Sequence, residues 1–358
     1  MFKAVKFDYE SNYVEDFLKL PKLLYSKNEI VQNEKEEKKL LLGTHLLSKY
    51  FNLYKFLVYS GSSISARCAL TVYPNDDIAY IGYFECADNA DCARVLFDTV
   101  RDFAEQNGCK KILGPVDASF WIKYRLKVNN FERRPYIAEP YNKEYYLKLF
   151  LDYGFSVCEE YASNAYERTP LAGYKNKKSE ERYKRFLKNN YQIITPKIKD
   201  WEKTVKEIYK LITGLYSDFP AYKNISEEDF IKHFESYKYI VDLSMVKMAY
   251  YNGEAVGFFI GMPDYGNTLY SGADLKTYIN VFLKKIRSSR YIMLYMGVSD
   301  RHKGLGMAMI YKIIKSVNAK RATAVGALIR EGKITGKYKS EGLESTYKYV
   351  LLSYNITV

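Results

Sequence analysis

The two halves of the sequence repeat one order of expected elements, and this repeat most restricts the fold that the chain can adopt. In the first half, runs rich in β-branched and aromatic residues at 55–60, 63–74 and 78–86 are separated by turn signals. Apolar residues at helical spacing follow and stop at Gly108. Each half is expected to contain helices, a hairpin, a strand, a turn, a helix, a strand, a helix and a last strand. The sequence therefore predicts two domains of the α/β class.

The second half carries the clearer local signals. Ser226 is expected to cap a helix that has acidic residues in its first turn. Asn252 and Gly253 lie between two apolar runs, which is the pattern of a two-residue hairpin turn. A strand is expected over 291–298 and a helix over 304–319.

The basic segment 174–190, with the sequence "YKNKKSEERYKRFLKNN", separates the two halves. It is interpreted as a connector or an exposed helix. Because 358 residues exceed the usual length of one domain, we predict two domains. Their expected bounds are 1–165 and 191–358, with the basic connector at 166–190.

The formal net charge of +13 raises the question of a nucleic-acid partner. The lysines are spread along the chain without a nucleic-acid-binding motif, so a solvated Lys-rich surface is the favoured interpretation. No apolar run has the length of a membrane span, and the first residues lack a signal segment. The five cysteines form no C-x-x-C pair. We expect a cytoplasmic protein without a metal site or a disulfide framework.

The stretch "MGVSDRHKGLGMAM", residues 296–309, lies where the expected strand turns into the expected helix. The start of a helix offers unpaired backbone N–H groups and a partial positive charge, which suit a pyrophosphate. Glycines at 304 and 306 keep side chains away from that position, and residues 301–303 add cationic character. A P-loop does not fit, since no Gly-Lys-Ser/Thr follows, and the dinucleotide-binding pattern fails at Met309.

The spacing Arg301-x-x-Gly304-x-Gly306 resembles the acyl-CoA signature Arg/Gln-x-x-Gly-x-Gly/Ala of the GNAT (Gcn5-related N-acetyltransferase) superfamily. The segment "YKSEGL" that begins at Tyr338 is similar to the superfamily's Tyr-x-x-x-Gly-Phe, with Leu343 in place of Phe. The hairpin sequence "MAYYNGEAVGFFIG" also resembles the superfamily. These similarities cover most of residues 190–358.

The resemblance implies two GNAT-like domains, each with a mixed, mostly antiparallel sheet flanked by helices. It implies that the pantetheine arm of acyl-CoA lies along the strand that ends at Val298, with a backbone N–H near Val298 as oxyanion donor. Tyr338 would be the general acid that protonates the leaving thiolate. Glu331 and Asp264 are candidates for the base, and a water chain is an alternative. The residues implied for acyl-CoA are Met296, Val298, Arg301, His302, Lys303, Gly304, Leu305, Gly306 and Met307.

The first half resembles the same superfamily with two parts missing. The turn "ECADNADCAR" has no glycine and places Glu85, Asp88 and Asp91 where phosphates would lie. Phe150 stands at the position that corresponds to Tyr338 and has no hydroxyl. We therefore expect a degenerate N-terminal domain, as in tandem GNAT-like bacterial proteins, and one CoA site per chain.

The expected function is acyl-CoA-dependent N-acylation, with acetyl as the expected group, of a primary amine on a small molecule or amino acid. One alternative is a Fem-type aminoacyltransferase that uses aminoacyl-tRNA, for which the basic segment would be a tRNA surface. Another is an acyl-CoA-binding protein without catalysis. The turn at Arg301, Gly304 and Gly306 favours CoA over tRNA. The acceptor amine and the oligomeric state stay open at this point.

Overall fold

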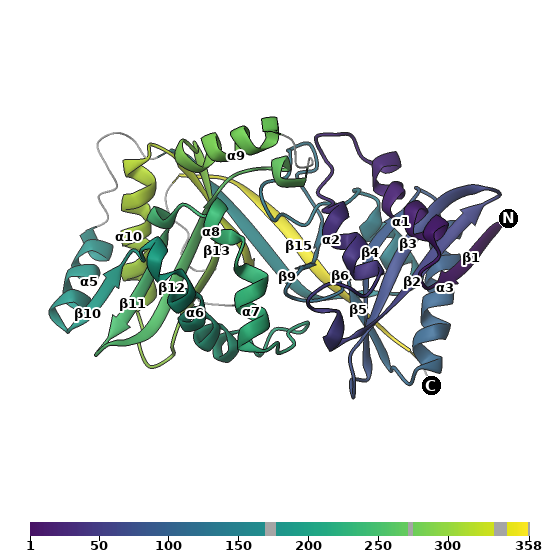
Figure 1. The fold of residues 1–358 in the computed structure, drawn as a ribbon, viewed down its shortest axis with the longest axis horizontal. Coiled ribbons are helices and arrows are strands. Elements are labelled where there is room, and N and C mark those ends of the chain that lie inside the picture. Colours follow the sequence, from purple (N-terminus) through teal and green to yellow (C-terminus); the bar gives the residue numbers. More distant parts are fainter. Residues whose placement is uncertain (169–176, 271–274, 333–341, 357–358) are drawn as a thin grey trace. The chain divides into compact units, whose positions relative to one another are not determined.

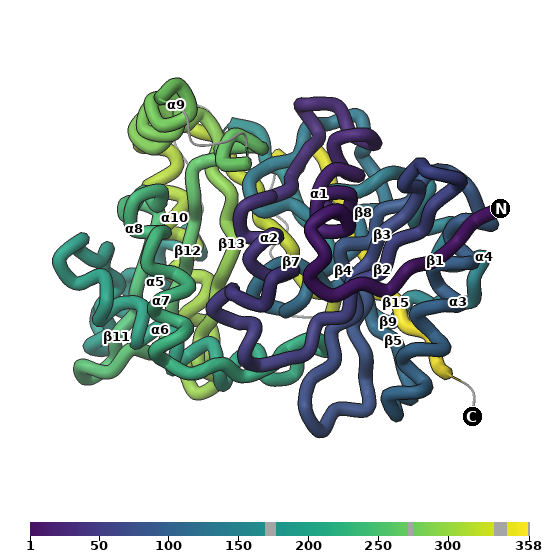
Figure 2. Tube along the Cα trace, turned by 45° about the vertical axis from the view of Figure 1, so that its right-hand side comes forward, coloured from purple at the N-terminus to yellow at the C-terminus, as the bar shows by residue number. Residues whose placement is uncertain are grey.

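The chain forms two compact units in the computed structural model (Figures 1 and 2). The structure describes residues 1–168, 177–270, 275–332 and 342–356. Unit 1 contains Met1–Tyr161, Pro220–Lys223 and Lys348–Val358, and unit 2 contains Ala162–Phe219 and Asn224–Tyr347. The domain bounds predicted from the sequence, 1–165 and 191–358, differ from these two units mainly because the last residues of the chain belong to unit 1.

Unit 1 has a mixed sheet in the order β1-β2-β3-β4-β5-β15, in which the β4–β5 pair is parallel and the other pairs are antiparallel. Its strands are β1 (Phe2–Phe7), β2 (Asn52–Ser60), β3 (Ser63–Val72), β4 (Ile78–Cys86), β5 (Lys111–Gly114), β8 (Leu126–Lys127), which pairs with β15 (Leu343–Asn355), and the small pair β6 (Val116–Asp117) and β7 (Lys123–Tyr124). Its helices are α1 (Ser11–Leu24), α2 (Glu34–Leu41), α3 (Ala90–Gln106) and α4 (Tyr146–Tyr153), with a 3-10 turn η1 (Ser48–Tyr50). β9 (Ser156–Tyr166) begins in this unit and ends in unit 2, and β15 begins in unit 2 and ends in unit 1.

Unit 2 has described strands in the order β14-β13-β12-β11-β10. The β13–β14 pair is parallel, and the β12–β13, β11–β12 and β10–β11 pairs are antiparallel. Its strands are β10 (Tyr191–Ile194), β11 (Val246–Tyr251), β12 (Glu254–Pro263), β13 (Arg290–Val298) and β14 (Thr323–Arg330). Its helices are α5 (Lys177–Lys188), α6 (Trp201–Leu215), α7 (Glu227–Phe234), α8 (Tyr237–Ile240), α9 (Leu275–Ile286) and α10 (Leu305–Ala319), with 3-10 turns η2 (Ile198–Asp200), η3 (Leu243–Met245) and η4 (Thr268–Tyr270). The predicted α/β class with mixed, mostly antiparallel sheets flanked by helices is confirmed.

Local sequence signals set several element ends. Ser226 caps α7, because its side chain accepts the backbone N–H of Asp229. Asn252 and Gly253 both have positive φ, 51° and 86°, as the hairpin turn between β11 and β12 requires. Gly154 ends α4 in the left-handed region at φ 114°.

Helix α10 is fixed to the sheet of unit 2 by its apolar face. Leu305, Met309 and Ile313 are buried against residues of β11 and β12 such as Ala249 and Val256. Helix α5 lies within the segment expected as a connector, and it packs on α10 through the rings of Tyr183 and Tyr311, whose centroids are 5.3 Å apart. The described part of the basic segment, α5, is therefore a helix of unit 2 that buries Phe186 and packs on α10, rather than a connector between the two units.

A close backbone approach shapes the centre of unit 1. A Cβ atom placed on Gly82 of β4 would lie 1.9 Å from the carbonyl oxygen of Val116. The main chain at Val116 and Asp117 therefore runs directly against β4, and only glycine leaves room for it.

Replacing Gly82 by Ala is expected to destabilise unit 1, since the clash is with backbone that cannot rotate away. Overpacking of this kind costs roughly 1–3 kcal/mol, and we expect the upper end of that range. Thermal unfolding followed by circular dichroism should show a melting temperature lower by about 5–10 °C. Gly214→Ala is the matched control, because nothing lies within 4 Å of its Cβ position in α6. An unchanged melting temperature for Gly82→Ala would contradict the close approach.

Candidate functional site

Strand β13 continues beyond its pairing with β14. The two strands pair in parallel from Arg290 to Met293 of β13, opposite residues 323–326 of β14. β13 continues to Val298 and β14 to Arg330, so the strands part after Met293. On its other side β13 has one extra residue, Leu294, opposite the β12 step between Ile260 and Gly261. A bulge of this kind bends a strand and increases its twist, which accounts for the parting.

The phase of the β12–β13 hydrogen bonds shows which backbone groups face the opened edge. Ser299 donates its N–H to the carbonyl oxygen of Val256 at 2.9 Å, so this is a hydrogen-bonded pair. Such pairs alternate along an antiparallel ladder. The N–H and C=O groups of Met296 and Val298 consequently point away from β12, toward the side that β14 has left.

The opened edge leads directly into the start of α10. Gly304 is the N-cap of α10 at φ +87°, a conformation that side-chain-bearing residues rarely adopt, and no side chain caps this helix. Within the turn, the N–H groups of His302 and Leu305 donate to Ser299 and His302 carbonyls at 2.9 and 3.1 Å. The other N–H groups of the first helical turn have no intrahelical acceptor and can bind an anion.

Cationic side chains surround this helix start. Arg301 and Lys303 are exposed in the turn, which also contains the acid Asp300. Arg182 of α5 approaches from the neighbouring helix, with its Nη1 3.9 Å from the position that a Cβ on Gly304 would occupy. α10 has no acid in its first turn. The local charge therefore favours an anionic ligand.

His302 is held by a tyrosine of β10. The hydroxyl of Tyr191 and Nδ1 of His302 are 2.8 Å apart. Burial, with a smaller contribution from Tyr251, raises the pKa of Tyr191. The hydroxyl thus keeps its proton and can donate it to Nδ1, which fixes the imidazole beside the turn.

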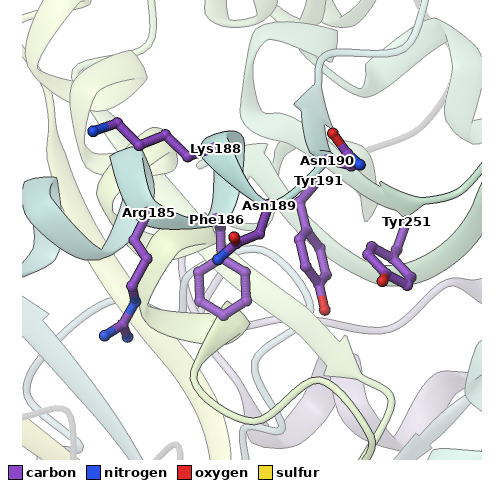
Figure 3. A pocket seen from close by; sticks show the side chains of 7 residues that line it. All are labelled: Arg185, Phe186, Lys188, Asn189, Asn190, Tyr191 and Tyr251. Carbon is purple, nitrogen blue, oxygen red and sulfur yellow. The ribbon is translucent and has the colours of Figure 1, made fainter.

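Tyr191 also lines a hollow of about 510 Å³ between α5, β10 and β11 (Figure 3). The residues that line it are Arg185, Phe186, Lys188, Asn189, Asn190, Tyr191 and Tyr251. The rings of Tyr191 and Tyr251 lie side by side, with centroids 4.5 Å apart and planes 30° apart. Both rings contact the imidazole of His302, with ring centroids 5.5 Å apart in each case, so the two tyrosines lie next to the turn that precedes α10.

The segment after α6 contacts both parted strands. Tyr216 donates its hydroxyl hydrogen to the carbonyl oxygen of Met296 at 3.2 Å. Arg330, at the end of β14, donates from Nη1 to the backbone oxygen of Asp218 at 3.2 Å. The sequence analysis missed Tyr216 because it lies 80 positions from Met296 and belongs to no motif.

The structure brings together most of the residues predicted for acyl-CoA. Met296, Val298 and Met307 are half-buried along the opened strand and helix start, while Leu305 and Gly306 are buried, so that these last two can contribute only backbone groups. Glu331 is exposed directly after β14. Asp264, the other base candidate, pairs with Arg290 at 2.5 Å and anchors the start of β13. Tyr338 lies outside the described residues.

In unit 1 the corresponding edge of β4 is already occupied by the chain itself. β4 pairs with β5 only as far as Tyr80, so these two strands part as well. The main chain at Val116 fills the opening beside Gly82. The N–H of Tyr83 donates to Oδ1 of Asp117 at 2.6 Å. No comparable opening is left among the described residues of β4.

The end of β4 and the start of α3 are also satisfied internally. Cys86 donates its N–H to the Tyr146 hydroxyl at 3.0 Å and accepts from the Tyr145 hydroxyl at 2.8 Å. Asn89 caps α3, because its side chain accepts the N–H of Cys92 at 2.9 Å. α3 therefore lacks the uncapped start that α10 has.

Glu85 does not lie where the sequence analysis placed it. Its carboxylate is turned into unit 1, where it accepts from Tyr25 and Tyr146 at 2.8 and 2.7 Å. Burial raises the pKa of Glu85, although the nearby Arg67 favours its ionised form. Only the exposed Asp88 and Asp91 of that turn remain near the start of α3. The prediction was wrong for Glu85 because its strand position, the last but one of β4, directs it toward these partners.

Among the described residues, no group of three or more His, Cys, Asp and Glu side chains is arranged to hold a metal ion. Within the same residues, no helix has both the length and the apolar character needed to cross a membrane. Phe150 is fully buried in the core of unit 1, next to Phe84 and Phe97.

The sequence matches no family model and no curated protein. The fold is shared with solved structures. A tandem GNAT protein from the clavulanic acid biosynthesis pathway aligns over 100% of this chain and 99% of its own, with a TM-score of 0.55 and 11% identity. A GCN5-related N-acetyltransferase from Sphaerobacter thermophilus aligns over 99% and 96%, with a TM-score of 0.50 and 10% identity.

A conserved protein of Enterococcus faecalis V583, described as a probable N-acyltransferase, aligns over 99% of this chain and 73% of its own, with a TM-score of 0.51 and 8% identity. The fold of this chain is therefore that of tandem GNAT proteins. The similarity predicted from the Arg301, Gly304 and Gly306 spacing is confirmed at the level of the fold.

Proposed function

We propose that this protein is an N-acyltransferase that binds acyl-CoA in unit 2 and transfers its acyl group, expected to be acetyl, to a primary amine of a small molecule or amino acid. One observation carries the proposal: the edge of β13 beyond Met293, which no strand of the described residues pairs with on the β14 side, runs directly into the uncapped start of α10. An extended amide-containing arm joined to a pyrophosphate is complementary to this combination.

Each part of acyl-CoA has a matching group in unit 2. The pantetheine amides pair with the outward N–H and C=O groups of Met296 and Val298, as an added strand would. Tyr216, which now donates to Met296, yields that carbonyl to the ligand. The pyrophosphate lies on the N–H groups at the start of α10, where Gly304 offers no side chain. Arg301, Lys303 and Arg182 supply positive charge.

The reaction needs one nucleophile, one base and one acid. The amine nitrogen attacks the thioester carbon, and the oxygen that becomes negative is held by a backbone N–H near Val298. The carbon–sulfur bond then breaks, and Tyr338 gives its proton to the leaving thiolate. The proton of the amine passes to Glu331, directly or through water. Glu331 is favoured over Asp264, because Asp264 is engaged by Arg290.

Two structures with a similar fold support transfer of an acyl group to an amine. One similar chain is described as a glucosamine N-acetyltransferase region of a fungal β-N-acetylglucosaminidase, and 38% of that longer chain is covered, with a TM-score of 0.54 and 12% identity. The tandem GNAT structure is described as solved without AcCoA. These descriptions support an acyl-CoA donor and an amino acceptor for this chain as well.

Gly304→Val is expected to abolish the rise in melting temperature that CoA produces. A Cβ would block the phosphate approach, and φ +87° is strained for valine. Differential scanning fluorimetry with and without CoA measures the effect. Gly61→Val is the matched control, since Gly61 has φ +60° and nothing within 4 Å of its Cβ position, but lies in the β2–β3 turn of unit 1. If CoA still raised the melting temperature of Gly304→Val, the start of α10 would not be the pyrophosphate site.

Tyr338→Phe is expected to lower kcat by roughly 10²–10⁴-fold, the usual contribution of one general acid. Its affinity for acyl-CoA should change little, because the hydroxyl acts on the leaving thiolate. A screen of primary amines by thiol release first identifies an acceptor, and steady-state kinetics then compare the two proteins. Calorimetric titration with CoA serves as the control for binding. Equal kcat in both proteins would assign Tyr338 no part in proton transfer.

The intact chain is expected to bind about one CoA. In unit 1, Val116, Asp117 and Tyr146 already occupy the groups that a pantetheine arm would use. An unpaired backbone group must find a partner, and here the chain supplies it. Isothermal titration calorimetry gives the stoichiometry directly. A value near two sites per chain would show that unit 1 can open and that its filled edge is not a barrier.

A further inference from the structure

Helix α9 presents its apolar residues outward. The exposed fractions are 76% for Leu275, 62% for Tyr278, 50% for Ile279, 61% for Phe282, 47% for Leu283 and 45% for Ile286. These positions follow the spacing i, i+3, i+4, i+7, i+8 and i+11, so they form one continuous stripe along the helix. Figures 1 and 2 show α9 (green) outside the sheet of unit 2.

The opposite face of α9 is mostly polar and is the one that contacts the protein. Thr277, Val281 and Lys284 are half-buried, and Ser288, one turn further along the chain, is buried. Lys284 donates from Nζ to the carbonyl oxygen of Tyr265 at 3.0 Å. A helix of a globular protein normally buries its apolar stripe and exposes its polar face. α9 is therefore inverted, and its attachment to unit 2 does not depend on its apolar stripe.

The charge of α9 indicates what covers the stripe. The helix contains Lys276, Lys284 and Lys285 without any acid, and Arg287 follows it. Lys285 also donates to the carbonyl oxygen of Tyr239 at 2.7 Å, and the ring of Tyr239 is 68% exposed. A second copy of the same helix would bring like charges together. An anionic lipid surface offers both an apolar interior and negative headgroups.

We infer that α9 is an interfacial helix that docks unit 2 on anionic membranes. The apolar stripe would enter the boundary between headgroups and acyl chains. The exposed cations Lys276 and Arg287 would contact the lipid phosphates, while Lys284 and Lys285 hold the helix to unit 2. Tyr278 and Tyr239 suit the same depth, since aromatic rings with a polar end favour the interface. This docking does not depend on the proposed acyl transfer.

Sedimentation with vesicles tests the inference on the full chain. Vesicles of equal parts phosphatidylglycerol and phosphatidylcholine should bind the protein, and vesicles of phosphatidylcholine alone should bind it much less. Raising the salt from about 0.1 M to about 1 M should release part of the protein, since the Debye length falls from about 10 to about 3 Å. Absence of binding to the anionic vesicles at low salt would overturn the inference.

Ile279→Ser combined with Phe282→Ser should weaken vesicle binding, by about tenfold for each side chain. Both side chains are at least half exposed, so the variant should keep the wild-type melting temperature. Leu23→Ser combined with Ile198→Ser is the control, because these residues are 58% and 56% exposed on other elements. Equal binding by wild type and the α9 variant would reject the helix as the docking site.

Two further readouts separate a membrane from a second copy of the chain. Tyr278→Trp should give an additional fluorescence emission that shifts to the blue when anionic vesicles are added. Analytical ultracentrifugation without lipid should give the same mass for wild type and the α9 variant. A dimer that the α9 variant loses would overturn the lipid assignment, and so would an emission that vesicles leave unchanged.

Discussion

The parting of β13 from β14 after Met293 is the constraint on which the candidate site depends. One extra residue, Leu294, bends the strand, and the backbone groups beyond it lose their neighbour on one side. A buried peptide group without a hydrogen-bond partner costs about 1–3 kcal/mol. The parted strand must therefore be satisfied by side chains, by water or by a ligand. In unit 2 the described side-chain partner is the hydroxyl of Tyr216, which donates to the carbonyl oxygen of Met296 at 3.2 Å.

In unit 1, side chains of the protein itself form hydrogen bonds with the backbone groups of the parted strand. Its strand β4 also parts from its parallel neighbour, but Asp117 and the hydroxyls of Tyr145 and Tyr146 satisfy the exposed edge. Such partners are always present at high effective concentration, so a dissolved ligand competes poorly with them. The edge of β4 is thus filled by the chain itself in unit 1, whereas no strand of the described residues in unit 2 pairs with β13 on the β14 side beyond Met293.

The sequence predicts those parts of the fold that are determined by a few adjacent residues. The hairpin turn at Asn252, the cap at Ser226 and the start of α10 at Gly304 each follow from the backbone preferences of a few adjacent residues. The contact of Tyr216 with Met296 and the burial of Glu85 were not predictable, because they depend on how distant segments pack. The opened edge of β13 belongs to this second group. A bulge leaves no signal in the sequence, whereas the glycines that follow it do.

The two ends of β13 give unit 2 two separate surfaces. α9 precedes the strand and α10 follows it, and the nine residues between Arg290 and Val298 span about 30 Å at the rise of a β-strand. The salt bridge of Arg290 with Asp264 fixes the first end, and buried Leu305 fixes the second. The end of α9 and the cationic turn therefore lie near opposite ends of β13. The residues that would face lipid are thus separate from those proposed to bind an anionic ligand at Gly304.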